Sequence, residues 1–201
     1  MFFTKSSLGN ENLPGEHNAR NIAAAVAAID AALHHKNSPI KNINPDTIQK
    51  AIMTFKPPEG RLENLGIFEG IQYINDTAAT TPDAVCAAIR SFPKEKTILL
   101  AGGENKGLQY KELAEEISKG IKFLVLLEGS ASVRLINELK TLGWNKFSAG
   151  FNDMESAVSE ARKNAQKNDI IILSPGAASF NLFKHEFDRG EQFKQSIGRL
   201  A

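Results

Sequence analysis

The sequence has little of what would assign it to a specialised class of protein. Its 201 residues contain one cysteine, Cys86, so no internal disulfide can form, and this suits a reducing compartment. The formal net charge of +1 gives no electrostatic reason to expect a nucleic-acid partner or an anionic membrane. No apolar run approaches the roughly 18 residues of a membrane-spanning helix. The N-terminus shows no signal peptide, and we expect a cytoplasmic protein.

Several catalytic motifs are also missing. The glycine-containing stretch 101–107 lacks the Gly-Lys-Ser/Thr of a P-loop and does not match G-x-G-x-x-G. Ser174 does not lie in a G-x-S-x-G elbow. His185 has no partner at the spacing of metal ligands. We therefore expect no metal site in these residues, and the sequence assigns no catalytic residue.

The first part of the chain is helical in pattern. Residues 17–35 are rich in Ala, Ile, Val and Leu on nearly all sides, which predicts a helix packed inside a larger body. A second helix is expected to begin at Asn44 and Pro45, as its N-cap and first helical residue. The adjacent prolines Pro57 and Pro58 prevent a helix from continuing and predict a boundary. We divide the chain into domains 1–57 and 58–201.

After this boundary, strand-like and helix-like segments alternate. A hairpin is expected over residues 61–75, with Glu69 and Gly70 as its turn. Further strands are expected at 97–101, 122–127, near Phe147 and at 170–173. Helices are expected at 81–91, 109–119, 131–142 and 153–166. Repeated strand–helix units predict an α/β fold with a Rossmann-like, mainly parallel sheet and helices on both faces.

Three loops that follow strands carry polar groups. They are residues 75–82, residues 101–107 and the small-residue loop around Ser179. Because carboxyl ends of parallel strands lie at one edge of a sheet, we expect these loops to converge there and form a binding site. His17, Asn18 and Asn21 cluster at the start of the first helix, where capping of the helix is an alternative role.

Three motifs, taken in chain order, resemble those of the Mur ligase family of peptidoglycan synthesis. Residues 13–21, LPGEHNARN, look like the family's G-x-H-N-x-x-N signature. Arg61 followed by NDTAAT at 75–80 resembles the start of its C-terminal domain. The stretch IILSPGAASF at 171–180, with Arg189 and Gly190, is similar to the ending of the branch that adds D-glutamate to UDP-MurNAc-L-alanine.

The resemblance implies an ATP-dependent ligase that forms a peptide bond through an acyl phosphate. It implies that residues 1–57 are a short helical remnant of the central ATPase domain and that residues 58–201 are the C-terminal domain. ATP and Mg²⁺ would be bound mainly by the missing part of the central domain, so we expect this chain to be inactive alone. The implied partners are D-glutamate, UDP-MurNAc-L-alanine and ATP, with no nucleic acid or membrane, and a monomer is expected.

The resemblance also implies roles for individual residues. The positions that match nucleotide contacts are Asn21, Arg61 and Asp76, with Arg61 facing phosphate and Asp76 the ribose. The positions that match the D-glutamate pocket are Thr80, Lys106, Ser179 and the backbone at Phe180. His17 and Asn18 belong to the signature and have no assigned role.

The sequence departs from the family pattern at four of these or neighbouring positions. Ala78 stands where lysine is common, Gly60 where histidine is common, Gly176 for a usual cysteine and Asn181 for a usual aspartate. The change at Ala78 removes one cation from the amino-acid site and leaves its specificity open. Two alternatives therefore remain. One is a related ligase, of another Mur or folylpolyglutamate type, that uses a different amino acid. The other is a Rossmann-like binding module without catalysis.

Overall fold

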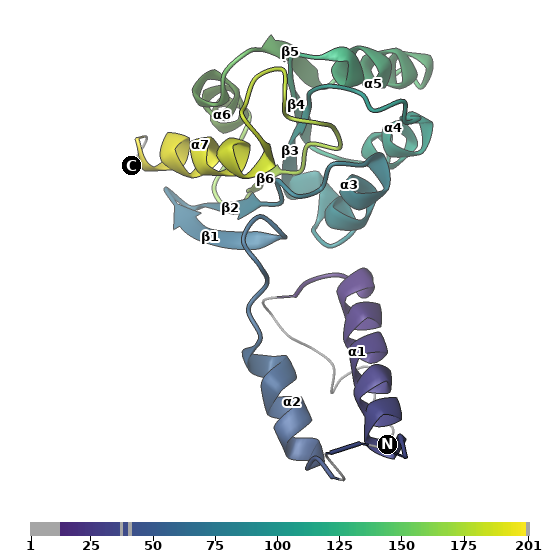
Figure 1. The fold of residues 1–201 in the computed structure, drawn as a ribbon. Coiled ribbons are helices and arrows are strands. Elements are labelled where there is room, and N and C mark those ends of the chain that lie inside the picture. Colours follow the sequence, from purple (N-terminus) through teal and green to yellow (C-terminus); the bar gives the residue numbers. More distant parts are fainter. Residues whose placement is uncertain (1–12, 37, 40–41, 200–201) are drawn as a thin grey trace. The chain divides into compact units, whose positions relative to one another are not determined.

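A computed structural model describes residues 13–36, 38–39 and 42–199 of the chain (Figure 1). The chain forms two compact units, Met1–Pro57 and Pro58–Ala201. Residues 1–12 of the first domain expected from the sequence lie outside the described residues.

The described residues of the first unit form two helices, α1 (Glu16–His34) and α2 (Pro45–Thr54). The predicted start of α2 is confirmed, because the Asn44 side chain accepts a hydrogen bond of 2.9 Å from the Asp46 N–H. No residue of α1 is buried, and Ile29 is 37% exposed. The packing of α1 inside a larger body therefore stays a prediction. Within the described ranges, no helix has both the length and the apolar character needed to cross a membrane.

The second unit is built on a six-stranded sheet. Its strands are β1 (Glu63–Phe68), β2 (Ile71–Asn75), β3 (Thr97–Gly102), β4 (Phe123–Leu127), β5 (Phe147–Phe151) and β6 (Ile170–Leu173). Their spatial order is β1-β2-β6-β3-β4-β5. The β1–β2 hairpin is antiparallel and every other pair is parallel. The predicted hairpin and the mainly parallel sheet are both confirmed.

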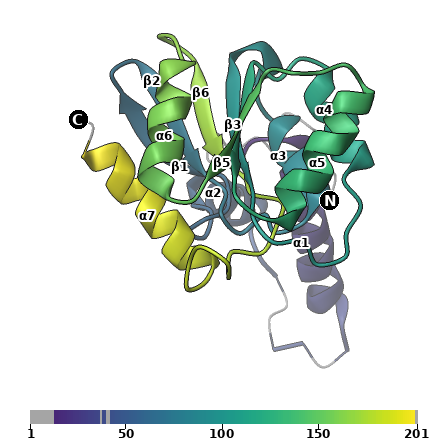
Figure 2. The ribbon, with the colours of Figure 1, turned by 90° about the horizontal axis from the view of Figure 1, so that it is seen from above.

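Helices cover both faces of this sheet (Figure 2). One face packs against α3 (Pro82–Ile89), α4 (Lys111–Ser118) and α5 (Ser130–Thr141), and the other against α6 (Met154–Lys163) and α7 (Glu186–Gly198). A short 3-10 turn, η1 (Lys94–Lys96), precedes β3. Successive strand residues alternate between the two faces, so Leu99 and Ala101 join the first core, whereas Ile98 and Leu100 join the second.

The helix α7 was not expected from the sequence, which shows only a polar segment with scattered phenylalanines. The helix begins at Glu186 after His185, whose Nδ1 accepts a hydrogen bond of 3.1 Å from the Asp188 N–H. Its buried residues are Arg189, Gly190, Phe193, Ser196 and Ile197. These positions share one helical face, but an arginine, a serine and a glycine among them hide the apolar periodicity.

Two loops at the carboxyl edge of the sheet approach each other very closely. A Cβ atom on Gly129, after β4, would lie 2.2 Å from the carbonyl oxygen of Gly103, after β3. Gly129 also has a φ of 149°, which side-chain-bearing residues rarely adopt. The contact between these loops therefore depends on glycine at this position.

We predict that Gly129→Ala lowers the free energy of unfolding by about 3 kcal/mol or more, because backbone atoms have to move. Gly143→Ala is the matched control, since Gly143 also has a positive φ, of 69°, but a Cβ there meets nothing within 4 Å. We expect this control to lose only about 1 kcal/mol. Urea unfolding followed by circular dichroism measures both values, and equal losses would contradict the importance of the close contact.

Candidate functional site

The strand order creates a topological switch point at the carboxyl ends of β2, β6 and β3, where a crevice is expected in α/β folds. The last strand, β6, lies between β2 and β3. The chain leaves β2 and β3 toward α3 and α4 on one face, whereas it leaves β6 toward α7 on the other face (Figure 2). Loops that leave neighbouring strands toward opposite faces open a crevice where ligands of α/β proteins bind. The candidate site therefore lies at this switch point.

The three loops expected to converge do meet at this crevice. The Gly102 N–H donates to the Pro175 carbonyl, and the Gly176 N–H donates to the Ala79 carbonyl, both at 2.8 Å. Glu104 and Ala178 exchange two backbone hydrogen bonds of 3.0 and 2.9 Å. These bonds join the loop after β6 to the loops after both of its neighbours, which confirms the predicted convergence.

The side chains expected to bind the amino acid lie on these three loops and form no bonds with other described residues. Thr80 is half-buried, Lys106 is exposed and Ser179 is 2% exposed. Within the described ranges, none of these three side chains forms a hydrogen bond or an ion pair with the protein. Phe180 is 70% exposed, so its ring lies on the surface and only its backbone borders the loop. Two hydroxyls and one cation are thus available to a ligand.

The loop that carries Lys106 is held by hydrogen bonds at its base. The Ser130 hydroxyl donates to the Glu104 carboxylate at 2.5 Å and accepts from the Asn105 N–H at 3.0 Å. The Asn105 side chain in turn accepts from the Leu108 N–H at 2.8 Å. These contacts fix the residues on both sides of Lys106 and leave its own side chain exposed.

A fourth loop, formed by Glu128 and Gly129 between β4 and α5, also borders the site and was not predicted as part of it; Ser130 follows it as the first residue of α5. Besides the contact of Ser130 with Glu104, the Asn181 side chain donates to the Glu128 carbonyl at 2.7 Å. This loop thus supports both the Lys106 loop and the loop after β6. The sequence contains a signal for this loop, since Glu128 and Gly129 also follow a strand and precede a helix.

Asp76 and Arg61 are neighbours with different roles. The buried Asp76 carboxylate accepts hydrogen bonds from the Leu62 N–H at 3.1 Å and from the Ser174 hydroxyl at 2.7 Å. Burial raises the pKa of Asp76 to about 6, opposed by these two hydrogen bonds and by the charge of Arg61. Asp76 therefore holds the backbone beside Arg61. The exposed Arg61 guanidinium forms no hydrogen bond or ion pair with any described residue.

Arg61 is better placed than Asp76 to bind an adenine nucleotide. The free guanidinium of Arg61 suits a phosphate group. Both carboxylate oxygens of Asp76 already accept from protein groups, so a ribose hydroxyl would have to share one of them. Among the described residues, no group of three or more His, Cys, Asp and Glu side chains could hold a metal ion.

Arg189 on α7 connects the loop after β2 with the loop after β6 by hydrogen bonds from its buried side chain. Its side chain is fully buried and donates to the Thr77 hydroxyl at 3.1 Å, the Thr77 carbonyl at 2.9 Å and the Ala177 carbonyl at 3.2 Å. No described carboxylate forms an ion pair with it. Burial lowers the pKa of Arg189 to about 10, so it is still charged at neutral pH. In the sequence, Arg189 stands out only as part of the third motif, and no role for it was predicted.

The remaining expected residues belong to the first unit, at the start of α1. The Asn18 side chain donates to the Pro14 carbonyl at 2.8 Å. His17 is half-buried, and burial lowers the pKa of its imidazole. Asn21 is exposed. Asn18 therefore ties the first turn of the helix to the loop before it, and nucleotide binding by Asn21 stays a prediction.

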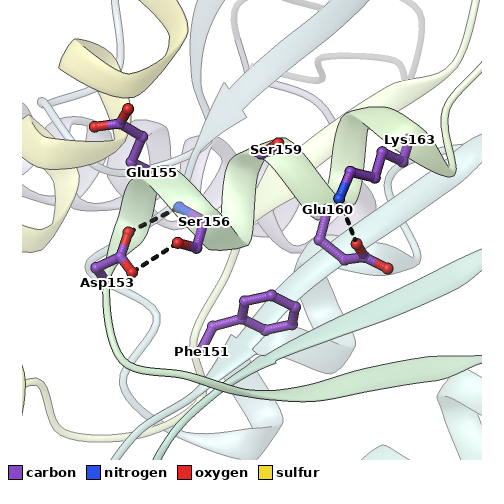
Figure 3. A pocket seen from close by; sticks show the side chains of 7 residues that line it. All are labelled: Phe151, Asp153, Glu155, Ser156, Ser159, Glu160 and Lys163. Carbon is purple, nitrogen blue, oxygen red and sulfur yellow. Dashed lines mark hydrogen bonds and ion pairs between the residues drawn. The ribbon is translucent and has the colours of Figure 1, made fainter.

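A second concave surface lies beside β5 and α6 (Figure 3). Its volume is about 360 Å³, and its lining residues are Phe151, Asp153, Glu155, Ser156, Ser159, Glu160 and Lys163. Asp153 accepts from both the N–H and the hydroxyl of Ser156, and Glu160 pairs with Lys163. Because three of its four charged residues are acidic and most of its polar groups are satisfied, this surface is a poor site for an anionic ligand.

The fold defines a Rossmann-like domain with a candidate site of polar side chains at the switch point of its sheet. Residues 60–176 match the family described as Mur ligase, glutamate ligase domain. The chain belongs to this family.

Curated relatives align with nearly the whole chain. The UDP-N-acetylmuramoylalanine–D-glutamate ligase of Roseiflexus sp. (strain RS-1) is 41% identical over 186 residues, which cover 92% of this chain and 38% of the relative. The UDP-N-acetylmuramoyl-L-alanine–L-glutamate ligase of Xanthomonas campestris pv. campestris (strain 8004) is 33% identical over 195 residues, covering 94% and 39%. The chain thus spans about two fifths of the length of these relatives.

Solved structures share the fold at lower sequence identity. The folylpolyglutamate synthase of Mycobacterium tuberculosis, complexed with ADP and AMPPCP, has a TM-score of 0.65 and 15% identity, covering 93% of this chain and 41% of that one. The MurF ligase of Thermotoga maritima, in complex with ADP, has a TM-score of 0.60 and 16% identity, covering 93% and 40%. The predicted α/β class is therefore confirmed.

The raised pKa of Asp76 predicts a pH dependence of stability. The ordinary pKa is 3.8 and the folded value is about 6, so between these pH values the folded protein binds more protons than the unfolded chain. Stability therefore falls as the pH rises through this window and levels off above it.

We predict that Asp76→Asn removes this dependence, because an amide does not titrate. The free energy of unfolding of the variant, relative to the unmodified protein, is expected to rise by about 2–3 kcal/mol from about pH 4 to pH 7. Urea unfolding of both proteins at four pH values measures the difference. A difference that does not change with pH would show that Asp76 titrates normally.

Proposed function

We propose that this chain is the amino-acid-binding and nucleotide-contacting portion of an ATP-dependent ligase that adds D-glutamate to UDP-MurNAc-L-alanine in peptidoglycan synthesis. One observation carries the proposal. Three polar side chains, those of Thr80, Lys106 and Ser179, form no hydrogen bond or ion pair with any described residue, and they lie on loops that hydrogen bonds hold together at the switch point of the sheet. Family membership and the names of the curated relatives support the same reading.

The chemistry of the crevice suits an acidic amino acid. The Lys106 ammonium provides a positive charge for one carboxylate, and the hydroxyls of Thr80 and Ser179 donate hydrogen bonds to carboxylate oxygens. Holding both carboxylates fixes the position of the amine that attacks the activated carboxyl group of the other substrate. Such positioning is a large part of what a ligase of this type contributes to the rate.

The nucleotide side of the proposal uses different residues. Arg61 would contact a phosphate of ATP, and Asp76 would hold the Arg61 segment while sharing an oxygen with the ribose. Asn21 is also proposed as a nucleotide contact. ATP supplies the phosphoryl group that activates the carboxyl substrate, and Mg²⁺ would neutralise phosphate charge. Both would be bound mainly by parts of the ligase other than these residues. We assign residues 1–57 to the end of its central ATPase domain and expect the enzyme to act in the cytoplasm as a monomer.

L-glutamate is the second candidate for the amino acid. Ala78 removes a cation that is common in the D-glutamate branch, and a relative with 33% identity is named as an L-glutamate ligase. Both enantiomers carry the same two carboxylates and one amine, so the free side chains in the crevice suit either one. The two substrates differ in the direction of the amine once both carboxylates are held.

The first test is the activity of the complete open reading frame that contains these residues. We expect phosphate release that requires ATP, UDP-MurNAc-L-alanine and D-glutamate together. A larger kcat/KM with L-glutamate would select the second candidate, and a preference for a non-acidic amino acid would favour a different ligase type. The absence of a P-loop from that reading frame would favour a binding module without catalysis.

The second test addresses the crevice. We predict that Ser179→Ala raises the KM for D-glutamate about tenfold and that Lys106→Met raises it about 100-fold, because each removes a hydrogen bond to a charged ligand. The KM for ATP is expected to change less than about twofold. Ser159→Ala and Lys163→Met, on the second concave surface, are the matched controls. A raised KM in the controls, but not in the crevice variants, would place the amino acid on that other surface.

A further inference from the structure

Arg189 is unusual for a buried charge, because no described carboxylate forms an ion pair with it and only the charge of Glu186 acts on it from a greater distance. Among the buried polar and charged residues of the described part of the chain, it is the one lysine or arginine. Its acceptors are two carbonyls and a hydroxyl, and no described carboxylate forms an ion pair with it. Removing a guanidinium from water is costly, and hydrogen bonds to neutral acceptors compensate only part of that cost. Stability of the fold alone does not account for a charge at this place.

The acceptors of Arg189 lie next to the residues proposed to bind the amino acid. Thr77, which accepts two of the hydrogen bonds, is three residues before Thr80. Ala177, which accepts the third, is two residues before Ser179. The planar guanidinium therefore fixes the separation between the loop after β2 and the loop after β6.

Further contacts hold the arginine itself in place. The Thr77 hydroxyl, which accepts from Arg189, donates to the Glu186 carbonyl at 2.7 Å, so the loop after β2 is also bound to the start of α7. Gly190 lies against the same loop, since a Cβ there would be 2.8 Å from the Thr77 Cγ2 atom. Phe193 and Ile197 anchor the remainder of α7 in the core. The arginine thus projects from a rigid helix.

We propose that Arg189 is a positioning residue for the acidic amino acid, which it does not touch. By binding both loops it sets the distance between the Thr80 and Ser179 hydroxyls, and its buried charge makes the crevice more favourable for an anion. This inference rests on the proposed function for the identity of the ligand. The geometric part, which is the fixing of the two loops, does not depend on that identity.

The kinetic test uses the complete ligase. We expect Arg189→Met to raise the KM for D-glutamate at least tenfold, with the KM for ATP changed less than twofold. Arg189→Lys keeps the charge but loses the planar fork, and we expect a rise of about threefold. Arg134→Met, at an exposed position of α5, is the control and is expected to leave both KM values unchanged. Equal changes in both KM values, or no change, would overturn the inference.

If Arg189→Met does not fold, a less disruptive variant, Thr77→Val, tests the same contact. Thr77→Val has nearly the same shape but loses the hydroxyl that accepts from Arg189 and donates to Glu186. We expect it to raise the KM for D-glutamate about threefold and to leave the KM for ATP unchanged. An unchanged KM for D-glutamate in this folded variant would also overturn the inference.

Amide hydrogen exchange tests the fixing of the loops without any ligand. The N–H groups of Gly176 and Ala178 donate hydrogen bonds between the loops, and those of Leu99 and Val125 lie in buried strands. In Thr77→Val and Arg189→Met we expect at least tenfold faster exchange at the first pair and no change at the second. Uniform acceleration, or none, would overturn the positioning role. A ligase inactive with glutamate, but with this local acceleration, would instead refute the proposed function and leave the positioning role supported.

Discussion

The pairing of backbone groups between the loops after β2, β3 and β6 is the constraint on which the site depends. Residues 174–179 and most of residues 76–79 are buried, so their N–H and C=O groups need partners inside the protein. Gly102 pairs with Pro175, Gly176 with Ala79, and Glu104 with Ala178. Arg189 occupies two carbonyls that remain. Because the backbone is satisfied in this way, the side chains at the loop tips are left for a ligand.

The charges around the crevice divide into two groups. The carboxylates of Asp76 and Glu104 accept hydrogen bonds from protein donors. The cations Arg61 and Lys106 are exposed and form no ion pair with a described residue. The crevice therefore presents positive charge and hydroxyl groups outward, and its electrostatics favour an anionic ligand independently of the family to which the chain belongs.

Local signals in the sequence were sufficient for most of the fold. Alternating strand and helix patterns and the Glu69-Gly70 turn predict elements that the structure contains, and the helices expected from Thr81 and Asp153 do have these residues as N-caps. The convergence of three loops followed from parallel pairing alone. What could not be predicted depends on contacts between distant segments. The sequence of α7 is polar, and the helix is stabilised by packing of its buried residues against the core. Arg189 can bind both loops only because the pairing of β6 with β2 brings Ala177 close to Thr77.

The central place of β6 has a consequence for the synthesis of the chain. β1 pairs with β2, and β3, β4 and β5 pair in sequence, but β2 and β3 are joined only through residues 170–173. A ribosome therefore completes most of the unit before the sheet can close. Until then the two half-sheets expose the strand edges that β6 will cover, where other chains can pair. Folding of this unit is a late event during translation, and a chain that ends before β6 is a substrate for aggregation or proteolysis.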